Sequence, residues 1–198
     1  MPHTLRLLFL SGSARDGSLN KRLARLGADI AHRTGSAATF ADLGDYPLPL
    51  YDGDLETRDG VPDNALKLKS LMDAHQGIFI ASPEYNASFS PLLKNTLDWI
   101  SRIKDDAGVA GQVYRTRVFA LGSASPGAFG GLRGLLQIRQ VLEIGLGALV
   151  LPDQVIIPNA GKAFDANGQL SDKATADRLE AVVQRLTTAA HLMRSDAS

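Results

Sequence analysis

The alternation of short apolar runs with segments of helical periodicity constrains the fold of this chain more than any other sequence feature. Runs typical of buried strands cover residues 5–10, 37–43, 77–81 and 117–121, and a fifth strand follows in two pieces, 148–151 and 155–157. Amphipathic periodicity predicts helices over residues 19–33, 62–75, 89–102, 130–145 and 173–193. Strands that alternate with helices pair in parallel through right-handed crossovers. We therefore expect a single α/β domain over residues 1–198, in which a doubly wound, five-stranded parallel sheet lies between two layers of helices.

The composition excludes several kinds of function. Lys plus Arg and Asp plus Glu each number 21, so no net charge attracts the chain to nucleic acid or to an anionic membrane. The sequence contains no cysteine, which rules out thiolate nucleophiles, disulfides and cysteine-ligated metals. Any redox chemistry must therefore come from a bound cofactor.

The N-terminal apolar run is short for a targeting or membrane segment. It extends from Leu5 to Leu10 and includes Arg6. The apolar region of a signal peptide has about 7–15 residues, and a membrane-spanning helix needs about 20. We therefore expect a buried first strand, no membrane partner and a cytoplasmic location.

The loop after the first strand has the composition of a phosphate site. Ligands of doubly wound sheets bind at the carboxyl ends of the strands, and the N-terminus of the following helix attracts anions. The loop contains three hydroxyls, two glycines and a forked cationic donor, namely Ser11, Gly12, Ser13, Arg15, Gly17 and Ser18. Hydroxyls and a guanidinium donate hydrogen bonds to phosphate oxygens, and glycine lets the backbone approach them. The alternative is a serine-capped helix after an ordinary loop.

Two other nucleotide motifs fail in this loop. Gly12 and Gly17 have the spacing of the ATP-binding P-loop, but Ser18 and Leu19 follow where that motif needs Lys and then Ser or Thr. The dinucleotide fingerprint fails because its second glycine is missing. A terminal monophosphate therefore fits the loop better than ATP or a pyrophosphate.

The loop after the third strand suits a flat, hydrogen-bonding ring. Pro83 and Pro91 stiffen the segment, and Tyr85 lies between them. A ring such as isoalloxazine needs a contact face and backbone amides directed at its polar edge. Taken alone, the same residues are also compatible with a turn followed by a helix cap.

The two loops together resemble one known family. The motifs are Gly12-Ser13-x-Arg15-x-x-Ser18-x-Asn20 and Pro83-Glu84-Tyr85-Asn86, followed by Leu93-Lys94-Asn95 and Asp98-Trp99. This pattern resembles the NADPH-dependent FMN reductase family, the flavodoxin-like group that includes quinone, chromate and azo-dye reductases. The resemblance implies the sheet order 2-1-3-4-5 and an FMN-dependent oxidoreductase that takes electrons from NADPH or NADH. It also implies a small-molecule acceptor such as a quinone, flavin, azo compound or chromate, and a homodimer or homotetramer.

The same resemblance implies which residues contact FMN. The phosphate and ribityl chain would be held by Ser11, Ser13, Arg15, Ser18, Leu19 and Asn20. The ring would contact Pro83, Glu84, Tyr85 and Asn86. A third loop, residues 122–127, would contribute Ser123 and Ser125. Because the flavin carries the hydride chemistry, no catalytic residue is assigned.

Two alternatives remain open from the sequence. A flavodoxin-type electron carrier would bind FMN without its own NAD(P)H activity, although the balanced charge is unlike that of an acidic carrier. A serine hydrolase is suggested by residues 123–127, which narrowly miss the G-x-S-x-G motif. Its histidine would have to be His191, the only one that follows in the chain.

The remaining residues with possible chemistry have plainer explanations. No two histidines have the spacing of metal ligands, so no metal is expected. His32 and His75 are expected in the last turns of their helices, where positive charge is favoured. Trp99 is expected in the core or at a subunit contact. The helix over 130–145 is apolar around much of its circumference, which indicates a deep core position or an oligomer interface.

Overall fold

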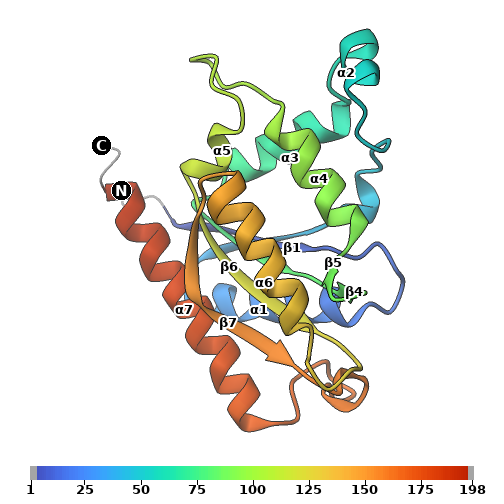
Figure 1. Ribbon diagram of the computed structural model, residues 1–198. Coiled ribbons are helices and arrows are strands. Elements are labelled where there is room, and N and C mark those ends of the chain that lie inside the picture. The colour runs from blue at the N-terminus through green and yellow to red at the C-terminus, as the bar shows by residue number, and fades with distance from the viewer. Residues whose placement is uncertain (1–3, 196–198) are drawn as a thin grey trace.

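The computed structural model describes residues 4–195 and contains the predicted alternation of strands and helices (Figure 1). In chain order the strands are β1 (Arg6–Ser11), β2 (Ala37–Asp42), β3 (Gly77–Ala81), β4 (Glu84–Tyr85), β5 (Ser88–Phe89), β6 (Val118–Ala124) and β7 (Leu149–Ile157). The helices are α1 (Leu19–Arg33), α2 (Gly53–Asp59), α3 (Asp63–Asp73), α4 (Pro91–Ser101), α5 (Gln112–Arg115), α6 (Leu132–Gln140) and α7 (Lys173–Ser195). Short 3₁₀ turns cover Leu43–Asp45 and Ala160–Lys162, and a π-helical turn, Val141–Gly145, extends α6.

The central sheet has the predicted order. Its strands lie in the order β2-β1-β3-β6-β7, and all neighbours pair in parallel. When only these five strands are numbered, the order is 2-1-3-4-5, which confirms the flavodoxin-like fold. The two short strands β4 and β5 form a separate antiparallel hairpin between β3 and α4.

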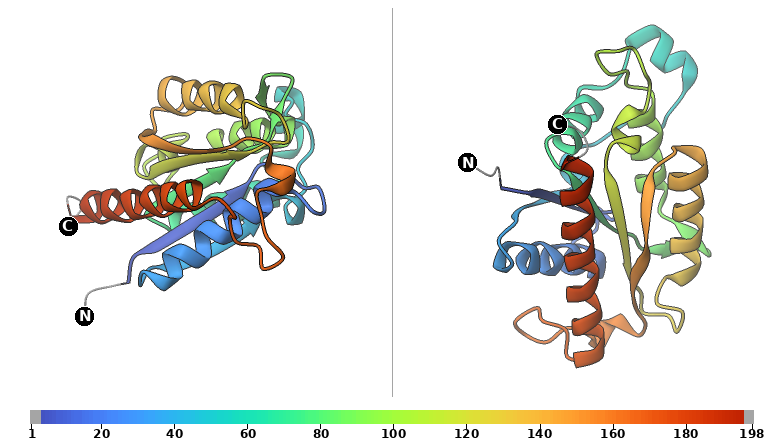
Figure 2. Two further views of the ribbon diagram at one scale, coloured as in Figure 1. Left: turned by 90° about the horizontal axis from the view of Figure 1, so that it is seen from below. Right: turned by 90° about the vertical axis from the view of Figure 1, so that its left-hand side faces the viewer.

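Helices cover both faces of this sheet (Figure 2). On one face, Leu7 and Phe9 of β1 pack in a cluster with side chains of α1 and α7. On the other face, Leu8 and Leu10 pack with side chains of α3, α4 and α6. Successive side chains of a strand point to opposite faces, so a strand covered on both sides must be apolar throughout. This explains why the strands form continuous apolar runs in the sequence.

Several local features differ from the sequence-based expectation. The region 44–60, where no strand or helix is predicted, contains α2, a helix with no buried residue and hence no apolar stripe to detect. The helix after β6 begins at Leu132 rather than at 130, because Gly130 and Gly131 have positive φ values of 59° and 92°. The last strand is continuous, and a register shift opposite β6 accommodates its polar middle.

None of the helices within residues 4–195 combines the length and the hydropathy needed to cross a membrane.

Candidate functional site

The loops that follow β1, β3 and β6 meet around a pocket at the carboxyl edge of the sheet. The pocket has a volume of about 240 Å³. It is lined by Ser13, Arg15, Ser18, Leu19, Asn20, Pro83, Glu84, Tyr85, Ala124, Ser125 and Pro126. All the predicted contact residues except Ser11, Asn86 and Ser123 are therefore brought together, although they come from three distant parts of the chain.

The three exceptions lie beside the pocket lining. Ser11 ends β1 and Ser123 lies in β6, and both side chains are fully buried. Within residues 4–195, neither hydroxyl has a hydrogen-bond partner. Asn86 lies at the turn of the β4–β5 hairpin, with a φ of 49°.

The first loop offers unpaired donors at the start of a 15-residue helix, α1. Ser18 caps this helix by accepting a hydrogen bond from the Lys21 amide at 3.3 Å, which leaves other first-turn amides without helical partners. The exposed Arg15 guanidinium makes no ion pair or hydrogen bond within the described residues. A free cation beside serine hydroxyls and a helix N-terminus fits a phosphate dianion.

A buried ion pair, not foreseen from the sequence, fastens the first loop to β2. Lys21 Nζ lies 2.6 Å from Asp42 Oδ2, and the two side chains are only 9% and 15% exposed. The same ammonium donates a hydrogen bond to the Ala14 carbonyl oxygen at 2.9 Å. Lys21, in the first turn of α1, thus fixes the position of the loop. Its pairing with Asp42 becomes visible only in the folded chain.

Asn20 connects the first and third loops. Its amide nitrogen donates to the Ala124 carbonyl oxygen at 2.9 Å, and its amide oxygen accepts from the Ala124 amide at 3.0 Å. These two hydrogen bonds join residues 104 positions apart. The side chain therefore holds the end of β6 against the start of α1, in addition to lining the pocket.

The hairpin after β3 presents an aromatic ring to the pocket. Tyr85 is 48% exposed, so one part of its ring is free for contact. Ser90, which caps α4, donates a hydrogen bond to the Gly12 carbonyl oxygen at 2.5 Å. A Cβ on Gly12 would lie only 3.1 Å from Leu93 and 3.3 Å from Pro83. Glycine at this position thus allows the loop after β1 and the loop after β3 to lie against each other.

The Glu84 side chain is directed toward α6. Its carboxylate accepts hydrogen bonds from the Arg133 amide at 3.0 Å and the Gly134 amide at 3.2 Å, and it also pairs with the Arg133 guanidinium. Burial acts to raise the pKa of Glu84, but the hydrogen bonds from Arg133 and Gly134 outweigh it and hold the pKa below its ordinary value. The carboxyl group therefore stays ionised and has partners already.

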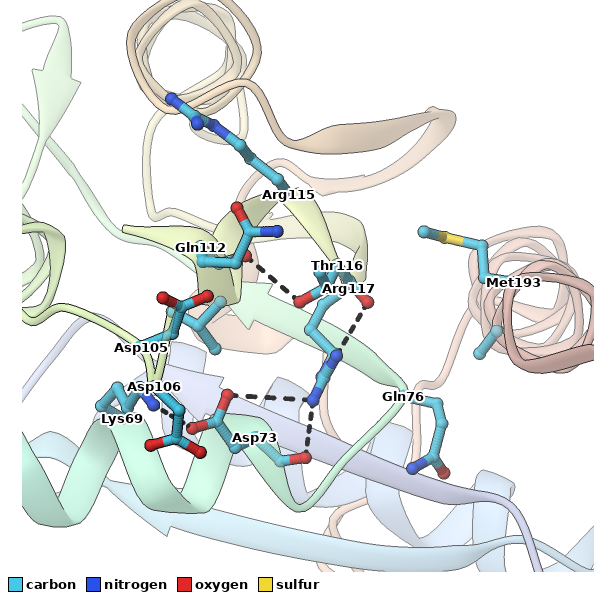
Figure 3. Close-up of a pocket in the computed structure, with 12 residues that line it drawn as sticks. Lys69, Asp73, Gln76, Asp105, Asp106, Gln112, Arg115, Thr116, Arg117 and Met193 are labelled. Atoms are coloured by element: carbon cyan, nitrogen blue, oxygen red, sulfur yellow. Dashed lines mark hydrogen bonds and ion pairs between the residues drawn. The ribbon is translucent and has the colours of Figure 1, made fainter. Parts of the chain in front are cut away.

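A larger cavity, of about 700 Å³, lies at the opposite, amino edge of the sheet (Figure 3). Some of its charged groups are paired, whereas the Arg115 guanidinium has no hydrogen bond or ion pair within the described residues. Lys69 Nζ lies 2.6 Å from an Asp73 carboxylate oxygen. Arg117 donates to the carbonyl oxygens of Asp73 at 2.7 Å and Thr116 at 2.9 Å. This cavity is far from the predicted contact residues, and the described residues that line it include three aspartates (Asp73, Asp105 and Asp106) and no serine.

The histidines and Trp99 have structural roles. His75 lies beyond the end of α3, with Nδ1 donating to the Leu71 carbonyl oxygen at 2.6 Å and Nε2 2.8 Å from Thr39 Oγ1. Burial lowers the pKa of His75, so the ring favours its neutral form although it lies near the C-terminus of α3. Trp99 is fully buried, as expected for a core position, and donates to the Pro49 carbonyl oxygen.

The hydrolase alternative lacks the geometry it needs. His191 lies on α7 beside Leu5 and Ser36, at the amino ends of β1 and β2. Ser123 and Ser125 belong to the opposite, carboxyl edge of the sheet. Within residues 4–195, no group of three or more His, Asp or Glu side chains is arranged to hold a metal ion.

The fold and the pocket define a class, the flavodoxin-like α/β proteins with an anion site after the first strand. Comparison with known proteins narrows this class. Residues 5–162 match the NADPH-dependent FMN reductase family. Over 183 residues the chain is 32% identical to the quinone reductase of Escherichia coli K12, covering 90% of this chain and 92% of that protein. It is 30% identical over 187 residues to an NAD(P)H-dependent FMN reductase of Pseudomonas aeruginosa, and the match covers 94% of this chain and 95% of that protein.

The solved structures agree on the fold. A flavoenzyme NAD(P)H:(acceptor) oxidoreductase from Paracoccus denitrificans superposes with a TM-score of 0.78 at 24% identity, covering 96% of this chain and 99% of that one. The chain belongs to the NADPH-dependent FMN reductase family. This confirms the predicted family, the FMN cofactor, the NAD(P)H co-substrate and the assignment as an oxidoreductase. These relatives are named as reductases, which does not support the electron-carrier alternative.

Proposed function

We propose that the carboxyl-edge pocket holds FMN by its phosphate and that the enzyme passes electrons from a reduced nicotinamide to a quinone. The observation that carries the proposal is the Arg15 guanidinium, which has no partner among the residues that the structure describes and lines the pocket with the hydroxyl-bearing Ser13 and Ser18 at the N-terminus of α1. A charged, forked donor beside helix amides matches a phosphate monoester.

FMN, when bound, supplies hydride acceptance and donation. The work of the chain is then to bind and orient. Ser13, Arg15 and Ser18 hold the phosphate, with Leu19 and Asn20 along the ribityl chain. Pro83, Tyr85, Asn86 and the Glu84 backbone contact the ring, and Ser125 borders it from the third loop. Ser11 and Ser123 are buried in β1 and β6, and no side chain is assigned as an acid or base.

The volume of the pocket bears on how the ring is bound. Sites for drug-sized ligands usually enclose about 300–1,000 Å³, whereas this pocket has about 240 Å³. The pocket would therefore suit the phosphate and ribityl end, and the half-exposed Tyr85 would be available to contact the ring.

A quinone is the proposed acceptor because relatives are named for it. These include the quinone reductase of Escherichia coli and a 2-hydroxy-1,4-benzoquinone reductase from Burkholderia, the latter 31% identical over 184 residues. Flavins, azo compounds and chromate remain the competing acceptors to test.

Anaerobic absorption spectroscopy tests this proposal. The purified protein, reconstituted with FMN, should lose its visible flavin absorption when NADPH is added, and 1,4-benzoquinone should restore it. Separate trials with NADH, an azo dye and chromate rank the donors and acceptors. A protein that binds FMN but is not bleached by either nicotinamide would contradict the proposed reductase.

A cytoplasmic location and a single functional domain are also part of the proposal. We further propose that the protein self-associates through the surface around α6. Four apolar side chains are exposed there, namely Phe129, Leu136, Ile144 and Leu149. Exposed apolar patches on a globular protein commonly mark interaction sites. Light scattering during size-exclusion chromatography should give a dimer or tetramer, and Ile144→Lys should shift it toward the monomer. A strictly monomeric wild type would contradict this proposal.

A further inference from the structure

The hairpin that carries the ring-contact segment holds a strained turn. Asn86 and Ala87 both have positive φ, 49° and 64°. Two-residue hairpin turns of this kind favour glycine at the second position, and a left-handed backbone is unfavourable for alanine. Such a conformation persists only when surrounding contacts fix it.

The missing cap of α6 is supplied by this hairpin. Gly131 precedes α6 in a left-handed conformation and offers no side chain to cap it. The Glu84 carboxylate takes that role from another element by accepting hydrogen bonds from the Arg133 and Gly134 amides. It is also an anion at the positive end of a helix, where negative charge is favourable.

Further contacts fix the hairpin on the same helix. The Arg133 guanidinium pairs with the Glu84 carboxylate and lies 4.9 Å from the centre of the Phe129 ring. Ser88 Oγ donates a hydrogen bond to Gln137 Oε1 at 3.1 Å. A Cβ on Gly134 would lie 3.1 Å from the Ser88 carbonyl oxygen, so glycine there allows the hairpin backbone to approach α6.

We propose that Glu84 is a positioning residue whose carboxylate fastens the β4–β5 hairpin to the N-terminus of α6 and thereby holds Tyr85 and Asn86 in place for the flavin ring. The part of this inference that concerns the ring rests on the proposed function; the attachment of the hairpin does not. The Glu84 side chain is 7% exposed, and its acceptor capacity is directed at α6. It therefore acts through the hairpin and not as a ligand of the flavin.

Hydrogen–deuterium exchange of the flavin-free protein tests the attachment itself. Glu84→Gln and Arg133→Gln should each accelerate exchange of the amides in 84–89 by about tenfold, and the double variant should be no faster than Glu84→Gln. Glu143→Gln is the matched control, because it removes an exposed ion pair with Arg139 farther along the same helical segment. If Glu84→Gln does not fold, the Arg133→Gln variant alone tests the attachment. It is the milder change, because the hydrogen bonds from the amides of residues 133 and 134 to Glu84 stay in place. Hairpin exchange that is unchanged, or equally raised in the control, would overturn the inference.

Flavin titrations test the effect on the ring. Glu84→Gln should weaken FMN and riboflavin by the same factor, about five- to tenfold, because both contain the ring. Arg15→Ala should weaken FMN alone, because riboflavin lacks the phosphate. A Glu84→Gln effect restricted to FMN, or no effect, would overturn the positioning role. If the wild type binds neither flavin, the proposed function fails, while the exchange experiment still decides the attachment.

Discussion

The two edges of the central sheet carry cavities that differ in size and in chemistry. The amino-edge cavity has about 700 Å³ and the carboxyl-edge pocket about 240 Å³. In the larger one, Lys69, Asp73 and Arg117 are bound to one another or to carbonyl oxygens. In the smaller one, the Arg15 guanidinium has no partner within residues 4–195. Arg115 of the larger cavity has no partner within these residues either, but that cavity is lined by three aspartates and no serine. The combination of a free cation with serine hydroxyls and a helix N-terminus, more than volume, therefore distinguishes the proposed ligand site.

The difference follows from the direction of the parallel strands. Every β-to-α connection starts at the carboxyl edge, where helix N-termini point toward the pocket and attract anions. The opposite edge gathers helix C-termini, whose free carbonyl groups take up cations such as Arg117. The same topology thus favours phosphate at one edge and cations at the other.

The largest expected effect comes from two glycines that share a φ of 92°, one at each edge. A Cβ on Gly131 would overlap the Ser123 hydroxyl and lie 2.6 Å from Ser123 Cβ, whereas Gly35 has open space. Gly131→Ala should lower the free energy of unfolding by about 3 kcal/mol or more, and Gly35→Ala by about 1–2 kcal/mol. Urea unfolding measures both, and equal losses would contradict the close packing of the carboxyl edge.

Removing the free cation comes next. Arg15→Ala should weaken FMN binding by about 10- to 100-fold, as expected for one charge-assisted hydrogen bond to phosphate. Its unfolding midpoint without flavin should match that of the wild type, since Arg15 has no partner within the described residues. Fluorescence titration measures the affinity. An unchanged dissociation constant would remove Arg15 from the phosphate site.

The corresponding change at the amino edge should have the opposite pattern. Arg117→Met leaves the Met72, Asp73 and Thr116 carbonyl oxygens without this donor. Stability should fall by about 1–2 kcal/mol, with the FMN dissociation constant unchanged. Urea unfolding and the same titration give both values. A loss of FMN affinity as large as in Arg15→Ala would show that the two edges are not independent.

The smallest expected effect is a pH dependence at the amino edge. Burial, with help from Arg6 and Arg117, lowers the pKa of His75 below its ordinary value, so the folded protein holds it neutral. The unfolded chain binds this proton at about pH 6.5; stability is therefore fully present above that pH and lost as the pH falls toward the lowered pKa. His75→Gln should reduce the drop in melting temperature between pH 7.5 and about 5.5. The exposed His32→Gln is the control, and an equal reduction in both variants would contradict a special role for His75.

Much of the fold could be predicted because its elements are defined by local patterns. The strands of the sheet are continuous apolar runs, and α1 has the same bounds, 19–33, that periodicity gave. Apolar patterns could not show a helix without buried apolar side chains, or a helix start that is set by glycine backbone conformation. The helix α2 has no buried residue, and the start of α6 is set by two left-handed glycines that have no helical periodicity.

The sequence predicted which segments form the candidate site, but it did not predict which side chains contact one another there. The serines and Arg15 share one loop, so composition and topology together indicated it. The partners of Lys21, Asn20 and Glu84 are 21, 104 and 49 positions away in the chain, and pairing at such distances is fixed only by the fold. This is why a lysine outside the motif and the attachment of the hairpin to α6 were not foreseen.

A crystal structure of the protein with FMN tests the central claim most directly. The account predicts the phosphate at the carboxyl end of β1, within hydrogen-bond distance of Ser13, Arg15 and Ser18, with the ring against Tyr85. A phosphate bound anywhere else, and above all in the amino-edge cavity among Lys69, Arg115 and Arg117, would contradict it.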